Sequence, residues 1–263
     1  MVLTKVKTQT YPTKELLGYK FIEEGEGEPI ILLHGLFGSL SNWNNVIDYF
    51  STKYKVIVPI LPVYDAKITE ANLESLLTYI EIFFYIKQLQ KVILTGNSLG
   101  GHLALLYTLK HPDKVDKLIL AGSSGLFENM IGSTFPKRGD YEFIKEKVSY
   151  TFYKKEVVTK ELVDEVYEVT QSIPKALKII SLARSAQKNN LADKLHQIIV
   201  PTLLIWGIND VITPTTTAIQ FKKLIPNSVI RYIDECGHVP MMEQPHHFNK
   251  YMDDFIKTSF WIS

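Results

Sequence analysis

The segment Val92-Ile-Leu-Thr-Gly96-Asn97-Ser98-Leu99-Gly100-Gly101-His102 decides the fold. Its first residues form a short apolar run that is typical of a buried strand, and residues 99–110 have a helical pattern. Gly-x-Ser-x-Gly joins the two, and Gly96 and Gly100 lack the Cβ atoms that would clash in a sharp turn. A serine on such a strained turn projects its hydroxyl above the sheet, where free N–H groups of the helix favour an oxyanion. The segment therefore predicts that Ser98 is a nucleophile.

Short apolar runs and helical patterns alternate along the chain on both sides of this segment. The expected buried strands are Ile30–Leu33, Lys55–Val58, Lys91–Leu94, Leu118–Ala121, Thr202–Trp206 and Val229–Ile233. The expected helices are Ser41–Phe50 (with Ser41 as N-cap), Asn72–Gln88, Leu99–Lys110, Thr216–Leu224 and His247–Lys257. Continuous apolar strands indicate a sheet that is covered on both faces. The alternation therefore predicts an α/β fold with a mostly parallel sheet between helices, whose strand C-terminal ends share one edge.

Two regions depart from this alternation. The pattern of Tyr19–Glu23 alternates and precedes Gly25-Glu26-Gly27-Glu28, which is typical of a hairpin turn, so we expect an antiparallel edge strand. Residues 126–195 contain no strand-like run and have apolar residues at helical spacing. These residues are Ile144, Val148 and Phe152, then Leu162, Val166 and Val169, then Leu177, Ile180 and Ala183. We predict a helical cap at 126–195 and a core domain at 1–125 and 196–263; the alternative is an ordinary set of surface helices.

Composition narrows the kind of partner. The 263 residues are 46% apolar and carry a net charge of +1 from 29 basic and 28 acidic side chains. This balance gives no strong field for nucleic acid or an acidic membrane, so we expect a near-neutral small molecule as the partner. The single cysteine, Cys236, allows no internal disulfide and fits a reducing compartment. We found no signal peptide pattern and no membrane-spanning apolar run, so we expect a cytoplasmic protein; the sequence does not specify its oligomeric state.

An acid and a base are expected near the end of the chain. Asp210 and His238 each follow a predicted strand, and an aspartate placed there can hold the tautomer of a histidine. Each residue taken alone also fits ordinary loop chemistry. The order Ser98, Asp210, His238 makes a catalytic triad the better interpretation, and Asp65 or Glu128 remains open as a displaced acid.

These motifs, together with Ile30-Ile-Leu-Leu33-His34-Gly35-Leu36-Phe37, resemble the α/β-hydrolase superfamily, and the resemblance extends from Tyr19 to Ile256. It implies a mostly parallel sheet of the eight-stranded type with a helical cap. It also implies an oxyanion hole made by the backbone N–H groups of Leu36 and Leu99 and a structural role for His34. The sequence has no Cys/His/carboxylate cluster with metal-ligand spacing and no Gly-rich phosphate loop, so we expect no metal or cofactor. The residues that we expect to contact substrate are Phe37, Asn97, Arg184 and Val239.

One departure limits what the resemblance implies about substrate. Many relatives carry a Gly/Ser-rich loop beginning with Asp where this chain has Pro59-Ile-Leu-Pro62-Val-Tyr-Asp65, so the substrate class does not transfer. Our first hypothesis is a serine hydrolase that cleaves a carboxylic ester or similar small, apolar acyl compound through an acyl-enzyme. The Gly96-Asn97-Ser98 and Trp206-Gly207 pairs, with Arg184, also resemble meta-cleavage-product hydrolases, which cleave C–C bonds. A ligand-binding module with little turnover is the third alternative.

Overall fold

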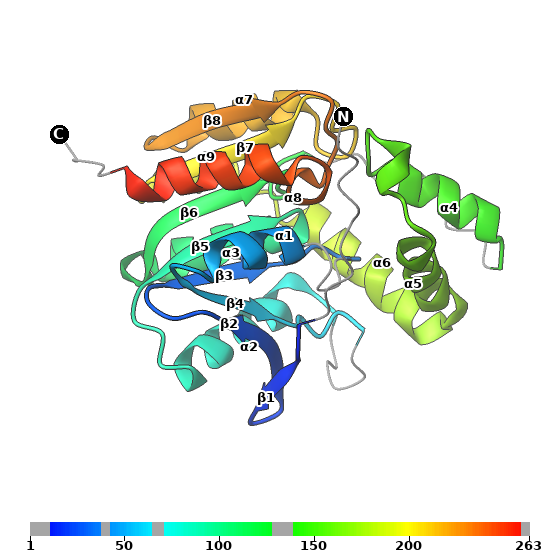
Figure 1. Ribbon diagram of the computed structural model, residues 1–263, viewed down its shortest axis with the longest axis horizontal. Coiled ribbons are helices and arrows are strands. Elements are labelled where there is room, and N and C mark those ends of the chain that lie inside the picture. Colours follow the sequence, from blue (N-terminus) through cyan, green and yellow to red (C-terminus); the bar gives the residue numbers. More distant parts are fainter. Residues whose placement is uncertain (1–10, 38–42, 65–70, 128–138, 259–263) are drawn as a thin grey trace.

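The computed structural model describes residues 11–37, 43–64, 71–127 and 139–258. Within these residues the strands form an eight-stranded sheet in the order β1-β2-β4-β3-β5-β6-β7-β8 (Figure 1). The strands are β1 (Lys14–Leu16), β2 (Tyr19–Glu24), β3 (Pro29–Leu33), β4 (Lys55–Pro59), β5 (Val92–Asn97), β6 (Val115–Ala121), β7 (Thr202–Gly207) and β8 (Ser228–Ile233). The β1–β2 and β2–β4 pairs are antiparallel, and the remaining pairs are parallel. The predicted fold class is confirmed.

Helices cover both faces of the sheet because successive strand residues point to opposite sides. The helices are α1 (Asn44–Phe50), α2 (Leu73–Ile86), α3 (Leu99–Lys110), α4 (Tyr141–Ser149), α5 (Lys160–Gln171), α6 (Ile173–Lys188), α7 (Thr215–Leu224), α8 (Pro240–Glu243) and α9 (Pro245–Lys257). On β3, Ile31 and Leu33 join a core with residues of α2, α3 and α7. Ile30 and Leu32 join the opposite core with residues of α1 and α9. The sheet is therefore buried on both faces, as its continuous apolar runs predict.

The prediction that residues 25–28 form a hairpin turn between two paired strands is wrong. Residues 25–28 lead from β2 into β3, but β2 pairs with β4, and β1 forms the edge of the sheet. Gly25 has a φ of +76°, and a Cβ there would lie 2.3 Å from the carbonyl oxygens of Ser51 and Tyr54. The turn glycine thus allows the chain to cross close to the segment between α1 and β4. The sequence shows the need for a glycine here but not the strand that comes between β2 and β3.

Helices α4, α5 and α6 lie between β6 and β7 in the chain and group beside one end of the sheet (Figure 1). We call residues 141–188 the helical insertion. Ile144, Val148, Val163 and Val166 form its own apolar cluster. The helix predicted from Leu177, Ile180 and Ala183 is confirmed as α6, in which Leu177 is 60% exposed and the buried residues are Leu182 and Ala186. These two side chains pack into the sheet core.

Two further expectations concern the helix N-caps and the absence of a membrane-spanning helix. Ser41, the expected N-cap of α1, lies outside the described residues; Asn72 caps α2 by accepting a hydrogen bond from the backbone N–H of Ser75 at 2.8 Å. In the described part of the chain, no helix has the length and apolar character that crossing a membrane requires.

Candidate functional site

Ser98 lies at the junction of β5 and α3 in a conformation that few side chains adopt. Its φ is 52° and its ψ is −120°, so the backbone is strained and the side chain leaves the path of both elements. The turn closes tightly: a Cβ at Gly96 would lie 2.3 Å from the carbonyl oxygen of Gly100, and one at Gly100 would lie 2.1 Å from that of Leu33. Both glycines of the motif are therefore needed for strand and helix to approach each other.

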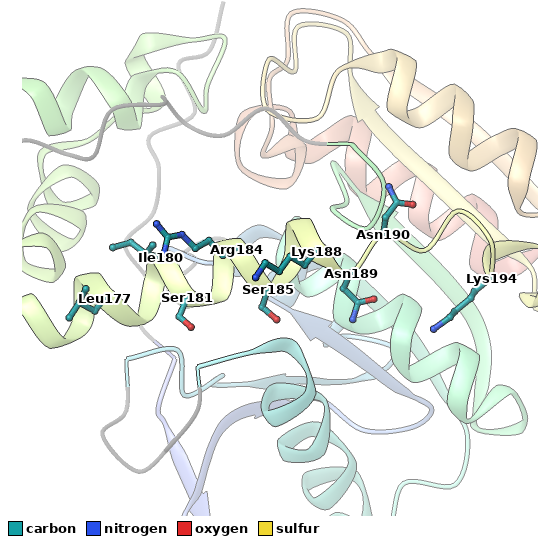
Figure 2. A pocket seen from close by; sticks show the side chains of 9 residues that line it. All are labelled: Leu177, Ile180, Ser181, Arg184, Ser185, Lys188, Asn189, Asn190 and Lys194. Carbon is teal, nitrogen blue, oxygen red and sulfur yellow. The ribbon is translucent and has the colours of Figure 1, made fainter.

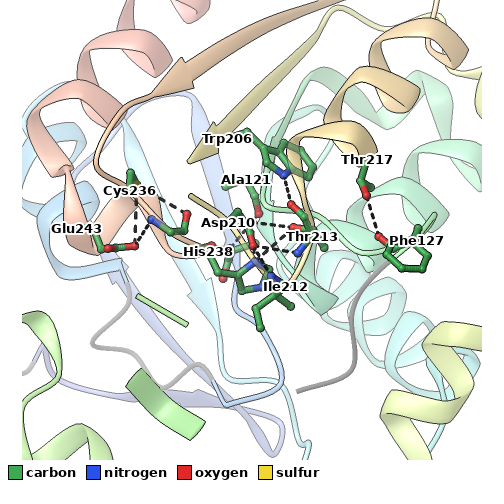
Figure 3. Close-up of polar contacts among 12 residues, drawn as sticks. Ala121, Phe127, Trp206, Asp210, Ile212, Thr213, Thr217, Cys236, His238 and Glu243 are labelled. Carbon is green, nitrogen blue, oxygen red and sulfur yellow. Dashed lines mark hydrogen bonds and ion pairs between the residues drawn. The ribbon is translucent and has the colours of Figure 1, made fainter. Parts of the chain in front are cut away.

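Asp210 follows β7 and is held by several donors. One oxygen, Oδ1, accepts hydrogen bonds from the backbone N–H groups of Ile212 at 2.8 Å and Thr213 at 2.9 Å. The other oxygen, Oδ2, accepts one from the hydroxyl of Thr213 at 2.8 Å (Figure 3). Asp210 is only 4% exposed. The three hydrogen bonds fix the orientation of its carboxyl group at the end of the strand.

His238 follows β8 and contacts the carboxyl group of Asp210. Its Nδ1 lies 2.9 Å from Oδ2 of Asp210, and the residue is 5% exposed (Figure 3). A neutral imidazole bonded in this way has its proton on Nδ1 and leaves Nε2 as an acceptor. Gly122, with a φ of +46°, makes room for the pair, since a Cβ there would lie 3.0 Å from Nδ1 of His238 and 3.1 Å from Oδ2 of Asp210.

Asn97 connects the histidine to the serine turn. Its side-chain amide donates to the carbonyl oxygens of Ala121 at 2.9 Å and His238 at 3.1 Å. The backbone N–H of Ser98 also donates to the carbonyl oxygen of Ala121, at 3.2 Å. The residue beside Ser98 thus binds the backbone of His238 directly. Asn97 is 2% exposed, and its expected contact with substrate stays a prediction.

The loop after β3 lies against the serine. A Cβ at Gly35 would be 3.3 Å from the Cβ of Ser98, which brings Leu36 beside the turn. Leu99 is the first residue of α3, so its N–H has no acceptor within the helix. His34 holds the loop: its Nδ1–H donates to the carbonyl oxygen of Gly35 at 2.8 Å, and its Nε2 accepts from the N–H of Leu61 at 3.0 Å.

The remaining predicted substrate contacts lie in different settings. Phe37 packs against the apolar cluster of the helical insertion, and Val239, next to His238, is 5% exposed. Arg184 is exposed on α6 and borders an open hollow together with Lys188, among other residues (Figure 2). Phe37 therefore follows the loop after β3, and Val239 lies in the loop after β8 that carries His238. No contact of Arg184 with these loops is described, and its role stays a prediction.

Sequence reasoning missed Thr213 and Glu243. Thr213 stands three residues after Asp210 and also accepts a hydrogen bond from the indole N–H of Trp206 through its carbonyl oxygen, at 2.7 Å (Figure 3). Nothing in the local pattern distinguishes it from an ordinary turn threonine. Glu243, five residues after His238, accepts hydrogen bonds from the backbone of Tyr153 and Lys154, which are distant in sequence. Its contacts depend on the folded insertion, which no local signal encodes.

Other candidate groups are accounted for more simply. Cys236 is fully buried, and burial raises the pKa of its thiol far above the usual range, with a smaller effect of the Glu243 charge, as is typical of a packing cysteine. Asp65 and Glu128, the alternative acids, lie outside the described residues. Among the residues that the structure describes, no group of three His, Cys, Asp or Glu side chains gathers as a metal site would require.

Comparison with known proteins agrees with this architecture. The family model of the alpha/beta hydrolase fold matches residues 28–245. An alpha/beta hydrolase enzyme from the metagenome of lagoon sediments at Mar Chica, Morocco, is 38% identical, with 94% of this chain and 98% of that chain covered and a TM-score of 0.77. The chain therefore belongs to the α/β-hydrolase fold family.

More distant relatives have named activities. The 2-hydroxy-6-oxo-6-phenylhexa-2,4-dienoate hydrolase of Comamonas testosteroni is 25% identical over 261 residues, which cover 89% of this chain and 90% of that protein. The meta-cleavage product hydrolase of Pseudomonas fluorescens IP01 has a TM-score of 0.81 at 23% identity, over 91% of this chain and 94% of that chain. The second likeness concerns the fold alone. Together with the family, these names support a hydrolase.

Proposed function

We propose that this protein is a serine hydrolase that cleaves a carboxylic ester or similar small, apolar acyl compound. The strained backbone of Ser98, with its φ of 52° at the β5–α3 junction, is the observation that carries the proposal. Such strain persists only where the surrounding structure enforces it, and it clusters at functional sites. The buried His238–Asp210 pair supports it, because Asn97 binds the histidine backbone to the same turn.

The proposed reaction has two steps. His238 removes the proton of Ser98 as the hydroxyl oxygen attacks the substrate carbonyl, and Asp210 stabilises the resulting imidazolium. The N–H groups of Leu36 and Leu99 bind the negative oxygen of the tetrahedral intermediate. His238 then protonates the leaving alcohol, and a water molecule hydrolyses the acyl-enzyme by the same proton transfers. In this scheme Asp210 faces the positive imidazolium, and the two N–H groups face the negative oxygen.

The surroundings favour an apolar acyl group. Phe37, which follows the oxyanion loop, packs on the insertion cluster of Ile144 and Val148, and the buried Val239 adjoins the histidine. We propose that the helical insertion acts as the cap that excludes water from this region. The predicted domain limits, 126–195 for the cap, belong to the same proposal.

The experiment that tests this function replaces Ser98. We expect Ser98→Ala to lower the rate of p-nitrophenyl butyrate hydrolysis by at least about 10³-fold while circular dichroism and the melting temperature stay unchanged. The wild-type protein should also become covalently labelled at Ser98 by a fluorophosphonate probe. Equal activity of wild type and variant would contradict the proposal. A protein that is stabilised by ester analogues but is not labelled would instead favour a ligand-binding module.

C–C bond hydrolysis is the second candidate, and the names of the curated relatives favour it. A dienoate substrate carries a carboxylate, for which Arg184 is the predicted partner. We expect that, if this candidate is correct, 2-hydroxy-6-oxo-6-phenylhexa-2,4-dienoate loses its long-wavelength absorbance when the enzyme is added. Arg184→Met should then raise KM for the dienoate and leave KM for a neutral ester unchanged. No turnover of a panel of such dienoates would remove this candidate.

A further inference from the structure

The carboxylate of Glu243 lies between the loop that carries His238 and the helical insertion. Its Oε1 accepts a hydrogen bond from the backbone N–H of Gly237 at 2.8 Å. Its Oε2 accepts hydrogen bonds from the backbone N–H groups of Tyr153 at 2.7 Å and Lys154 at 3.2 Å. Figure 3 shows Glu243 beside Cys236, on the far side of the loop from the Asp210 contact. One side chain therefore bonds two separate segments, of which the second lies 90 and 89 residues before Glu243 in the chain.

The two segments also touch directly. The backbone N–H of His238 donates to the carbonyl oxygen of Thr151 at 2.9 Å. A Cβ at Gly237 would lie 2.8 Å from that same oxygen and 2.9 Å from the N–H nitrogen of Tyr153. Only a glycine lets the backbones come this close. We call residues 151–154 the insertion connector, and its contact with residues 237–238 is a tight backbone-to-backbone fit.

A carboxylate in this position is costly for folding. Glu243 is 7% exposed, and burial raises its pKa, whereas the backbone hydrogen bonds from Lys154, Tyr153 and Gly237 lower it. Burial of a charge is tolerated when hydrogen bonds satisfy it. Packing alone would be met by an apolar side chain of similar volume. An apolar side chain could not accept the hydrogen bonds by which Glu243 holds the backbones of Gly237 and of Tyr153 and Lys154 in place.

We propose that Glu243 is a positioning residue that fixes the His238 backbone to the insertion connector. This inference rests on the proposed hydrolysis, because its functional effect is the alignment of the His238 imidazole with Ser98 and with the cap. Glu243 touches neither substrate nor reacting atoms and acts through the N–H groups of Gly237, Tyr153 and Lys154. The insertion and the base then keep one relative position when substrate enters.

The test compares Glu243→Gln with a matched control. Glutamine keeps the size of the side chain but turns an N–H₂ group toward donors that require an acceptor. Glu235→Gln is the control, since the exposed Glu235 carboxylate lies 3.2 Å from Nζ of Lys154 and thus joins the same two segments through a surface ion pair. We expect Glu243→Gln to lower kcat for p-nitrophenyl butyrate about tenfold to a hundredfold with KM unchanged. Glu235→Gln should keep the wild-type kcat.

Hydrogen–deuterium exchange gives a second measurement that does not depend on activity. In Glu243→Gln, peptides covering residues 151–154 and 236–239 should both exchange faster than in the wild type and in Glu235→Gln. A purely structural role would lower the melting temperature while kcat per active site, titrated with fluorophosphonate, stays at the wild-type value. That result, or unchanged exchange in both peptides, would overturn the proposal.

A backbone variant keeps the test decisive if Glu243→Gln does not fold. Lys154 has a φ of −90°, close to the range of proline, so Lys154→Pro removes one N–H donor and leaves Glu243 intact. Compared with Lys154→Ala, which loses the same side chain, Lys154→Pro should show the lower kcat. Equal kcat values for the two would contradict the role of the hydrogen bond. Failure of the wild type itself to hydrolyse esters or to react with fluorophosphonate would instead contradict the proposed function. Hydrogen–deuterium exchange alone would then test whether Glu243 fixes the His238 backbone to the insertion connector.

Discussion

Thr213 places its hydroxyl group where it meets both members of the buried His–Asp pair. The oxygen donates to Oδ2 of Asp210 at 2.8 Å and lies 3.4 Å from Nδ1 of His238. The residue is fully buried, so no water replaces this hydrogen bond when it is removed. The hydroxyl therefore helps to hold the carboxylate oxygen that faces the imidazole.

Thr213→Val should lower kcat/KM for ester hydrolysis. Valine keeps the shape and the backbone N–H bond to Asp210 but loses a charge-assisted hydrogen bond of about 1.5–3 kcal/mol, which corresponds to about ten- to a hundredfold. Thr217→Val is the matched control, because this threonine is 1% exposed and its hydroxyl binds the carbonyl oxygen of Phe127. Steady-state kinetics across pH measure the effect. A Thr213→Val enzyme as active as Thr217→Val would show that the hydroxyl does not contribute.

Cys236 is the single cysteine of the chain, so labelling of its thiol shows whether the protein structure around it opens. The thiol is fully buried, and burial raises its pKa, so little reactive thiolate is present. We expect iodoacetamide to leave the native protein unmodified over hours and to add one label in denaturant, as measured by intact mass. Rapid labelling of the native protein at neutral pH would contradict the described burial.

The residues of the site differ in how far sequence predicts them. Ser98, Asp210 and His238 could be proposed because each follows its own apolar strand, and parallel strands end at one edge. The structure brings His238 and Asp210 together, whereas the catalytic roles remain proposals. Thr213 and Glu243 could not be proposed, because their partners are set by tertiary contacts. No alternation or motif marks a side chain that bonds a distant backbone.

At the scale of elements, β3 and α3 approach each other closely at Gly100. Gly100 stands in the first turn of α3, and a Cβ there would lie 2.1 Å from the carbonyl oxygen of Leu33. Two effects oppose each other in Gly100→Ala. Alanine favours a helix over glycine by about 1 kcal/mol, but the contact is with backbone, which cannot move aside as a flexible side chain would.

We expect the steric effect to dominate in Gly100→Ala. Overpacking typically costs about 1–3 kcal/mol, and a displaced strand costs more, so the free energy of unfolding should decrease. Urea denaturation followed by circular dichroism measures it. Gln187→Ala, at an exposed position of α6, is the control and should change stability by less than about 0.5 kcal/mol. A stabilised Gly100→Ala protein would show that β3 and α3 can separate freely.

The elements that sequence misplaced have a common physical reason. Strand and helix positions follow from local apolar patterns, so β3 to β8 and the core helices agree with prediction to within a few residues. Pairing partners do not follow from such patterns, as the β2–β4 pair demonstrates. The spacing predicts the helix α6 but not its buried residues, which are Leu182 and Ala186, while Leu177 is exposed. Periodicity identifies a helix but not which neighbour covers it.

For the whole molecule, two buried histidines make stability depend on pH. Burial lowers the pKa of His34 and of His102 to about 4 from the ordinary value of 6.5. Between these values the unfolded chain binds protons that the folded protein does not, so stability rises with pH there. As the pH falls from about 6.5 to about 4, each histidine should remove up to about 1.4 kcal/mol of unfolding free energy per pH unit.

Urea denaturation at a series of pH values tests this dependence. His102→Leu should show a shallower loss of stability between pH 6.5 and 4 than the wild type, whatever its stability at pH 7. His246→Gln, at an exposed position, is the control and should keep the wild-type slope. If the curves of wild type and His102→Leu run parallel across this window, His102 does not take up a proton on unfolding.

The hydrogen bond from Asn97 to the carbonyl of His238 spans 141 residues of chain. During translation the serine turn leaves the ribosome long before the segment that contains His238. Until that segment emerges, the Asn97 amide lacks one of its two acceptors, the carbonyl oxygen of His238, and the turn has no imidazole beside it. If the proposed function holds, fragments that end before His238 do not hydrolyse esters.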